Sequence, residues 1–565
     1  MSCACTLGAV AGEFALDNGA SARYNLNLSL GTQVRATDPG VDQYSAMASR
    51  AVPGVPTGRL TSMTGGPDLN YEKGQPISTV LKAGFDLDLR QDRWGVFLSG
   101  LAWHDWAQGQ LSVPYGNYPN QFTPNAPLSD NGFSSSARFS GAQLRELYAQ
   151  SRTDWDSGAT LQTRLGRQLL DWGGSQLTPG GINNAIHPAD YAAAVRPGAL
   201  PTETRLPIGM LHLKLGTGTA WQYEAYWAGE SRKAEIPGCG TYFDVSAFTP
   251  QGCDFTAVNL TGVTTEQGYY NAGQYIHRNP DIDATGHHAG ISAGYTTEDK
   301  RTVLKWYALD TSAGMPSLRI TVNRLSFTPP SPLRGSYANL YVDHLRLYGV
   351  SFHSQLNATA RVFGELTLRP DQVISYSAAD LLNAFLVNGG PIASYRGTAA
   401  LPVGGTFDAY ERFRVHTGSL GASKTTSDVL GAHQLQLLGE WAFSHVSGLP
   451  GTELVRFGRP TAYGTAGNEG FVTATATSLR AYAALSYAQW LDNAVVTPSL
   501  SLTMDLSGYS FDGLVVQGRR IVRPAVRVEW AKSRFVEYQY NRFSGGAYNL
   551  VADRDFHALV AGVRF

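Results

Sequence analysis

The sequence contains no run of 18 or more apolar residues, so it predicts no helix that spans a bilayer. Charged residues make up only 16% of the 565 positions, and 44 Lys+Arg almost balance 45 Asp+Glu. The resulting net charge of −1 favours neither nucleic acid nor an anionic membrane surface as a partner. No linker or low-complexity block divides the chain, although soluble chains of this length usually form several domains. A transmembrane β-barrel fits these absences, because its strands need only about 9–11 residues each.

The first eleven residues lack a basic leader and are too short for a complete secretory signal. They end in Ala9-Val10-Ala11, which has the small residues of a signal-peptide cleavage site. We therefore interpret residues 1–11 as the remnant of a secretory signal peptide and residues 12–565 as the mature protein. The alternative is an ordinary N-terminal segment.

Cysteine is almost absent, with four residues in the whole chain. Cys3 and Cys5 fall in the segment interpreted as a signal remnant, which leaves Cys239 and Cys253. In an oxidising compartment these two could close a short loop, and such a disulfide is worth about 3 kcal/mol. We predict this disulfide, with two free thiols as the alternative.

Short turns and long loops alternate along the chain from about residue 20 to its end. Candidate strands are joined by tight polar turns at 91–93, 154–157, 216–218, 297–299, 357–358, 491–493 and 532–534, and by a longer turn around 423–431. Between these pairs lie segments rich in Gly, Pro, Asn and Ser, at 36–75, 104–139, 170–205, 231–285, 310–344, 370–408, 448–476, 507–520 and 544–554. Short connections on one side and long ones on the other are typical of outer-membrane barrels. The pattern predicts a single all-β domain, an antiparallel transmembrane barrel of about 18 strands, with 16–20 as the range.

The last strand ends on an aromatic residue, Phe565. Counting backwards in steps of two gives Val563, Ala561, Leu559 and His557, a largely apolar face. A closing strand of this form is what the barrel-assembly machinery of bacterial outer membranes reads. We therefore predict Phe565 to be an assembly signal and the assembly machinery and outer-membrane lipid to be partners.

Alternation within the best strands separates a lipid face from a lumen face, since a mid-membrane Arg or Lys on the lipid face costs about 2–4 kcal/mol. The polar set is therefore predicted to face the lumen: Lys82, Asp86, Asp88, Arg90, Arg523, Arg527, Glu529 and Glu537. These charges could bind or filter a solute, or they could neutralise one another in a wet interior. Aromatic residues near strand ends fit interfacial girdles: Trp94, Trp103, Trp441, Tyr487, Trp490 and Tyr538.

Two long loops contain helix patterns. Ser377 to Asp380 reads as a capping box, with Gly389-Gly390 as the stop, and 188–195 could form a shorter helix ended by Pro197. Neither is long enough to span a membrane. They could cap the barrel, fold into it as a constriction, or lie over the rim.

Catalytic and metal-binding patterns are weak. His287 and His288 are adjacent, so on a strand they would point to opposite faces, and no cluster of ligands accompanies them. Ser444 and His445 are the nearest candidates for a barrel hydrolase, but they diverge in the same way. The sequence predicts no enzyme and no cofactor, with an outer-membrane hydrolase as the least favoured alternative.

Several motifs resemble those of one family and keep their order along the chain. They include Leu69 to Gly74, Gly166-Arg-Gln-Leu-Leu-Asp-Trp-Gly173, Gly180-Gly-Ile-Asn183, Arg196-Pro-Gly-Ala199, Tyr348 to Phe352, Gly364-Glu365 and Asp553-Arg-Asp-Phe556. The chain resembles the proteobacterial outer-membrane family catalogued as domain of unknown function 1302. Gly174 departs from the pattern, because many relatives are expected to have an acidic residue there, so no role for that acid is carried over.

The resemblance implies a barrel in the bacterial outer membrane. It also implies association with an inner-membrane exporter of the resistance-nodulation-division superfamily and with a periplasmic lipoprotein-carrier-like protein, which would together export hydrophobic or lipid-like molecules. The leading hypothesis is therefore the outer-membrane component of such an export route. The alternative is a stand-alone porin or uptake channel for small substrates.

Overall fold

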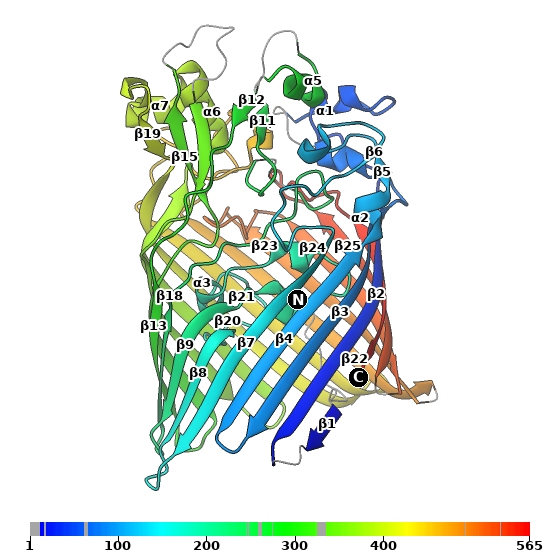
Figure 1. Cartoon of the computed structure of the whole chain (residues 1–565), viewed down its shortest axis with the longest axis vertical. Coiled ribbons are helices and arrows are strands. Elements are labelled where there is room, and N and C mark those ends of the chain that lie inside the picture. The colour runs from blue at the N-terminus through cyan, green and yellow to red at the C-terminus, as the bar shows by residue number, and fades with distance from the viewer. Residues whose placement is uncertain are drawn as a thin grey trace.

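The computed structural model describes residues 12–15, 19–60, 66–244, 246, 248–257, 263–273, 275–324, 335–491, 493–531 and 533–565. Its main feature is a closed antiparallel barrel of eighteen strands, which confirms the prediction of about 18 (Figure 1). Each strand pairs with the next, and the last pairs with the first to close the barrel. The strands are β2 (Ser21–Arg35), β3 (Pro76–Gln91), β4 (Trp94–Asp105), β7 (Ser140–Asp154), β8 (Thr160–Gln168), β9 (Ile208–Gly216), β10 (Trp221–Ala228), β13 (His288–Thr296), β14 (Thr302–Thr311), β17 (Leu345–Gln355), β18 (Ala360–Ser375), β20 (Tyr410–Val429), β21 (Ala432–Ser447), β22 (Thr475–Leu491), β23 (Ala494–Ser507), β24 (Arg520–Trp530), β25 (Arg534–Ser544) and β26 (Phe556–Arg564).

Short turns lie at one rim of the barrel and long loops at the other, as Figure 1 shows. The predicted longer turn around 423–431 is wrong, because β20 and β21 stay paired as far as Val429 and Ala432. Leu430 and Gly431 both have positive φ, at 53° and 76°, which forms a tight two-residue hairpin turn. The β-branched residues at 425–426 continue the strand, but they show no alternating apolar pattern that would indicate pairing there.

The outer face of the barrel is apolar. Leu81 and Phe85 of β3 are exposed there, whereas Lys82 between them is buried on the inner side. No helix among the described residues is both long and apolar enough to cross a bilayer. A closed barrel satisfies its backbone hydrogen bonds internally, and its apolar outside matches lipid. The protein is an outer-membrane barrel.

Three of the six predicted girdle aromatics are exposed on the outside of the barrel. Trp94 is 69% exposed, and Trp441 and Tyr538 are also exposed, while Tyr487 is partly buried. Trp103 is a wrong prediction: it is only 4% exposed and faces the lumen, where it packs against a loop residue, Arg196. Trp103 lies directly opposite Lys82 and is nine positions from Trp94, so strand alternation places the two tryptophan rings on opposite faces of β4. The side chain of Trp490 and residues 1–11 lie outside the part of the chain that the structure describes.

A layer of loop structure covers the long-loop rim (Figure 1). It contains the small sheet β16–β15–β19 and the pairs β5–β6 and β11–β12, and β1 adds to the edge of β2 at the other rim. Their bounds are β1 (Gly12–Ala15), β5 (Ser112–Val113), β6 (Ala126–Pro127), β11 (Phe255–Ala257), β12 (Tyr275–His277), β15 (Ser317–Val322), β16 (Gly335–Leu340) and β19 (Thr406–Asp408). The α-helices are α1 (Ala46–Ala51), α2 (Trp106–Gln110), α3 (Ile182–Ile186), α4 (Tyr191–Ala194), α5 (Glu266–Asn271), α6 (Ala378–Val387) and α7 (Gly390–Arg396). One-turn 3-10 helices are η1 (Gly66–Asn70), η2 (Tyr118–Asn120), η3 (Pro201–Thr204), η4 (Thr398–Ala400) and η5 (Thr461–Tyr463).

The two predicted loop helices form, with more short helices around them than expected. Ser377 caps α6 by accepting a hydrogen bond from the backbone N–H of Asp380, but Asp380 pairs with Arg456 and does not complete a capping box. The chain leaves α6 through Asn388, whose φ is 52°, and Gly390 starts α7. The predicted helix at 188–195 is the single turn α4.

Candidate functional site

The connection between β8 and β9, residues 169–207, turns into the barrel, and we call it the lumen loop. It contains α3, α4 and η3, and α3 is visible halfway down the barrel in Figure 1. Gly166, near the end of β8, has a φ of 133°, and a Cβ there would lie 2.3 Å from the carbonyl oxygen of Leu147. Only glycine fits this kink beside β7. The loop helices were predicted to cap the barrel, to fold into it or to lie over the rim. The lumen loop folds into the barrel, whereas α6 packs in the loop layer above.

Two buried carboxylates of the barrel wall bind one stretch of the lumen loop. Glu365 of β18 accepts hydrogen bonds from the backbone N–H groups of Gly174 (2.8 Å), Ser175 (3.2 Å) and Ile182 (3.2 Å). The contact with Ile182 caps the first turn of α3, which has no cap from its own side chains. Hydrogen bonds to an ionised acceptor are stronger than neutral ones, so Glu365 fixes residues 174–182 to the wall.

Glu440 of β21 binds the adjacent part of the same stretch. It accepts hydrogen bonds from the Ser175 hydroxyl (2.6 Å) and from the backbone N–H groups of residues 176–178, at 2.5–3.2 Å. In the sequence, Glu365 stands out only as part of a family motif, and Glu440 belongs to no motif. The sequence shows each of them only as an acidic residue at a lumen-facing strand position. Such a position does not reveal a binding partner some 190 to 265 residues away.

Close contact with the wall leaves no room for a side chain at Gly174. A Cβ at Gly174 would lie 2.3 Å from the carbonyl oxygen of Gly364, and one at Gly181 would lie 2.0 Å from a carboxylate oxygen of Glu365. Backbone and carboxylate already fill the space in which an acidic side chain would begin.

The far end of the lumen loop is bound to the opposite strands. Lys82 of β3 pairs with Glu203 (2.8 Å) and donates a hydrogen bond to the carbonyl oxygen of Gly198 (2.8 Å). Arg145 of β7 donates to two loop carbonyls, and Gln33 of β2 donates to a third, that of Val195 (3.0 Å). With Glu365 and Glu440 on the other side, the loop crosses the lumen.

An aromatic core supports the start of the lumen loop. Trp172 is almost fully buried, packs against Tyr226 of β10 and Tyr307 of β14, and donates a 3.0 Å hydrogen bond from Nε1 to Glu224. Tyr307 in turn accepts a hydrogen bond from the backbone N–H of Gly173. The family motif 166–173 therefore marks the point where the loop leaves β8 and docks on the wall.

The structure places most of the predicted lumen charges in ion pairs. Besides Lys82, Arg90 pairs with Asp88 (2.7 Å), and Arg527 pairs with Glu529 (2.8 Å) and Glu537 (3.2 Å). Asp86 is partly buried on the same face of β3. Arg523 differs, because no carboxylate of the described residues lies within 4 Å of it.

The weak catalytic and metal candidates do not come together. Ser444 lines a small cavity beside the lumen loop, whereas His445 points to the other face, where its ring contacts the Thr475 hydroxyl. His288 contacts Ser312 inside the barrel, and the His287 ring lies tilted against Trp227 outside. Within the described part of the chain, no group of three His, Cys, Asp or Glu side chains is arranged to hold a metal ion.

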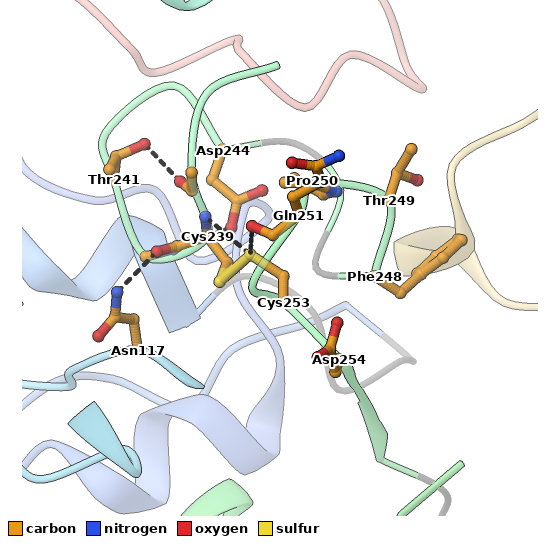
Figure 2. The surroundings of a disulfide bond; sticks show 12 residues. Asn117, Cys239, Thr241, Asp244, Phe248, Thr249, Pro250, Gln251, Cys253 and Asp254 are labelled. Carbon is orange, nitrogen blue, oxygen red and sulfur yellow. Dashed lines mark hydrogen bonds between the residues drawn. A yellow bond between two sulfur atoms is a disulfide. The ribbon is translucent and has the colours of Figure 1, made fainter. Parts of the chain in front are cut away.

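Cys239 and Cys253 form a disulfide in the loop layer, with 5.9 Å between their Cα atoms (Figure 2). Both are buried, and the carbonyl oxygen of Cys239 accepts a hydrogen bond from the side chain of Asn117 (3.0 Å). The disulfide thus joins the β10–β13 loop to itself, and Asn117 joins it to the β4–β7 loop.

The barrel resembles several solved structures at low sequence identity. They include OccAB1 of Acinetobacter baumannii (TM-score 0.41, 11% identity, 99% of this chain and 98% of that chain) and opdK of Pseudomonas aeruginosa (0.40, 10%, 96% and 98%). A BenF-like porin from Pseudomonas fluorescens Pf-5 is similar (0.41, 7%, 98% and 99%). No curated protein matches the sequence. A family described as "Protein of unknown function (DUF1302)" matches residues 1–565, and the chain therefore belongs to that family.

Proposed function

We propose that the protein is a gated outer-membrane conduit that stays closed until the lumen loop is displaced. The observation that carries this proposal is the attachment of residues 174–182 to Glu365 and Glu440, opposite the attachment of Glu203 to Lys82. A loop bound at both sides of the lumen lies in the way of any solute. Transport then requires these polar contacts to be exchanged for others.

We further propose that this conduit is the outer-membrane component of a route that exports hydrophobic or lipid-like molecules. Its partners would be an inner-membrane exporter of the resistance-nodulation-division superfamily and a periplasmic carrier. The family resemblance supports these partners. An apolar pocket in the loop layer supports a hydrophobic cargo. It lies between α6 and the sheet of β15 and β16, and it is lined by Phe248, Leu318, Ile320, Leu382, Phe385 and Leu386.

Single-channel conductance in a planar bilayer tests the gate. The wild-type protein is expected to be silent or to open rarely. The double variant Glu365→Gln/Glu440→Gln is expected to open often, because a neutral amide oxygen accepts weaker hydrogen bonds from backbone N–H groups than a carboxylate does. Glu537→Gln is the matched control, since Glu537 lies in the lumen wall and pairs with Arg527. Gentle solubilisation followed by identification of a bound exporter or carrier tests the export route.

A stand-alone channel for small solutes is the second candidate. The observation that favours it is the charged lumen wall on β24 and β25, where Arg527, Glu529 and Glu537 form a polar surface suited to hydrophilic solutes. A large, steady conductance of the wild-type protein without a partner would select this candidate and would contradict the gate.

A further inference from the structure

Two arginines on the lumen face of β22 and β24, the strands on either side of β23, form no ion pair within 4 Å among the described residues. Arg480 of β22 lies directly opposite Thr503 of β23, and Arg523 of β24 lies directly opposite Ser501 of β23. Directly paired residues point to the same face of a sheet, so all four side chains share the lumen face. With strands about 4.8 Å apart and a rise of about 3.4 Å per residue, the two arginine Cα atoms are about 12 Å apart. Two arginine side chains can converge across that distance on one bound group.

Other arginines nearby are neutralised. On the same side of the barrel, Arg519 pairs with Asp505 (2.7 Å), and Arg527 pairs with two glutamates. Arg480 and Arg523 have no carboxylate within 4 Å among the described residues, and the Nε of each is enclosed without a hydrogen-bond acceptor. Arg523 makes no hydrogen bond to the described chain and has only the Phe543 ring at 6.0 Å. A desolvated cationic donor without an acceptor costs free energy. An anion bound here would accept its hydrogen bond and offset that cost.

We propose that Arg480, Arg523, Ser501 and Thr503 form an anion-binding site in the lumen. Guanidinium groups bind carboxylates and phosphates through paired hydrogen bonds, and the two hydroxyls between them supply further donors. The ligand is a phosphate or carboxylate group, either as a free small anion or as the head group of an amphiphilic cargo. The site rests on the proposed function in one respect, since its ligand is a molecule that passes through the lumen.

Arg480 also connects this site to the lumen loop. Its Nη1 donates a 3.1 Å hydrogen bond to the carbonyl oxygen of Leu177, in the stretch that Glu440 binds. An anion that draws the Arg480 guanidinium toward Arg523 competes with this contact. Binding at the site therefore loosens the loop at one of its attachments to the wall.

Isothermal titration calorimetry on the full chain in a neutral detergent tests the site, with inorganic phosphate and hexyl phosphate as probes at low ionic strength. Wild-type protein is expected to bind, and Arg523→Gln and Arg480→Gln are each expected to weaken binding at least tenfold. Arg527→Gln is the matched control, because it removes the same charge from the same face of β24, and it should change affinity less than threefold. Arg523→Lys should restore part of the affinity. Heat-modified migration on gels confirms that each variant is a folded barrel.

The outcomes separate the ligand sources. Equal affinity for both probes assigns the site to a free anion, and tighter binding of hexyl phosphate assigns it to an amphiphile head group. The proposal is overturned if the wild-type protein binds neither probe, or if Arg527→Gln weakens binding as much as Arg523→Gln. Calorimetry does not require an open pore, so a failed conductance test of the gate leaves this result standing, and the reverse also holds.

Discussion

Lys82 of the barrel wall and Glu203 of the lumen loop form a buried ion pair, with 2.8 Å between Nζ and Oε2. Their Cα positions are 121 residues apart in sequence, so the pair joins strand β3 to a segment that enters the barrel much later. The same Nζ also reaches the Gly198 carbonyl oxygen. One lysine therefore holds two points of the loop.

Replacing this lysine should release that end of the lumen loop. Lys82→Met leaves Glu203 buried without a counter-charge, and breaking one side of a buried pair typically costs about 3–5 kcal/mol. We expect faster hydrogen exchange at residues 198–206, with exchange in β20 and β21 unchanged. The double variant Lys82→Met/Glu203→Leu should restore much of the protection, because it removes both charges. Unchanged exchange in Lys82→Met would contradict the attachment.

Glu266 of α5 should make the loop layer sensitive to pH. Burial raises its pKa from 4.5 to about 8, and the hydrogen bond from the Tyr115 hydroxyl opposes this rise only in part. The folded loop keeps the proton up to about pH 8, whereas an opened loop releases it near pH 4.5. The stabilisation is therefore complete below pH 4.5 and is lost as the pH rises to about 8.

Hydrogen exchange of the α5 amides, corrected for intrinsic rates, measures this dependence. Protection in the wild-type protein should fall between pH 4.5 and 8 and then level off. Glu266→Gln mimics the protonated side chain, so its protection should stay flat over the same range. If wild type and variant show the same pH profile, Glu266 does not control the opening of α5.

Reduction of the Cys239–Cys253 disulfide should loosen the loop layer and leave the barrel intact. A loop of this length gains about 3 kcal/mol from a disulfide. We expect a reducing agent to accelerate hydrogen exchange and proteolysis within 238–254, and the serine double variant should behave like the reduced protein. Barrel strands should keep their resistance to unfolding in detergent. Loss of that resistance on reduction would contradict the assignment of the disulfide to the loops alone.

Phe565 should matter more for assembly than for the finished barrel. Its backbone pairs with Leu26 of β2 through two hydrogen bonds, but its side chain is 50% exposed. Phe565→Ala should lower the amount of barrel assembled in cells several-fold, while the variant refolded in detergent should be destabilised by no more than about 1 kcal/mol. Val563→Ala is the control on the same face. Equal effects of the two variants in cells would argue against a specific assembly signal.

Local sequence patterns are enough to predict the barrel and its two faces. Leu81, Lys82 and Phe85 already show which side chains meet lipid, because alternation within a strand is local and lipid strongly penalises charge. Turn residues and loop lengths determined the number and order of the strands in the same local way. The predictions were wrong at 423–431, where the local pattern was weak, and at Trp103, which lies an odd number of positions from Trp94 and therefore on the opposite face of β4.

The contacts inside the barrel become visible only in the folded chain. The contacts of Glu365 and Glu440 with the lumen loop join residues some 190 to 265 positions apart, and most of them use backbone N–H groups, which every residue has. The sequence therefore cannot mark these partners. Arg523 and Arg527 illustrate the same limit, since both are lumen-facing arginines on β24, and only the positions of neighbouring carboxylates leave one of them unpaired.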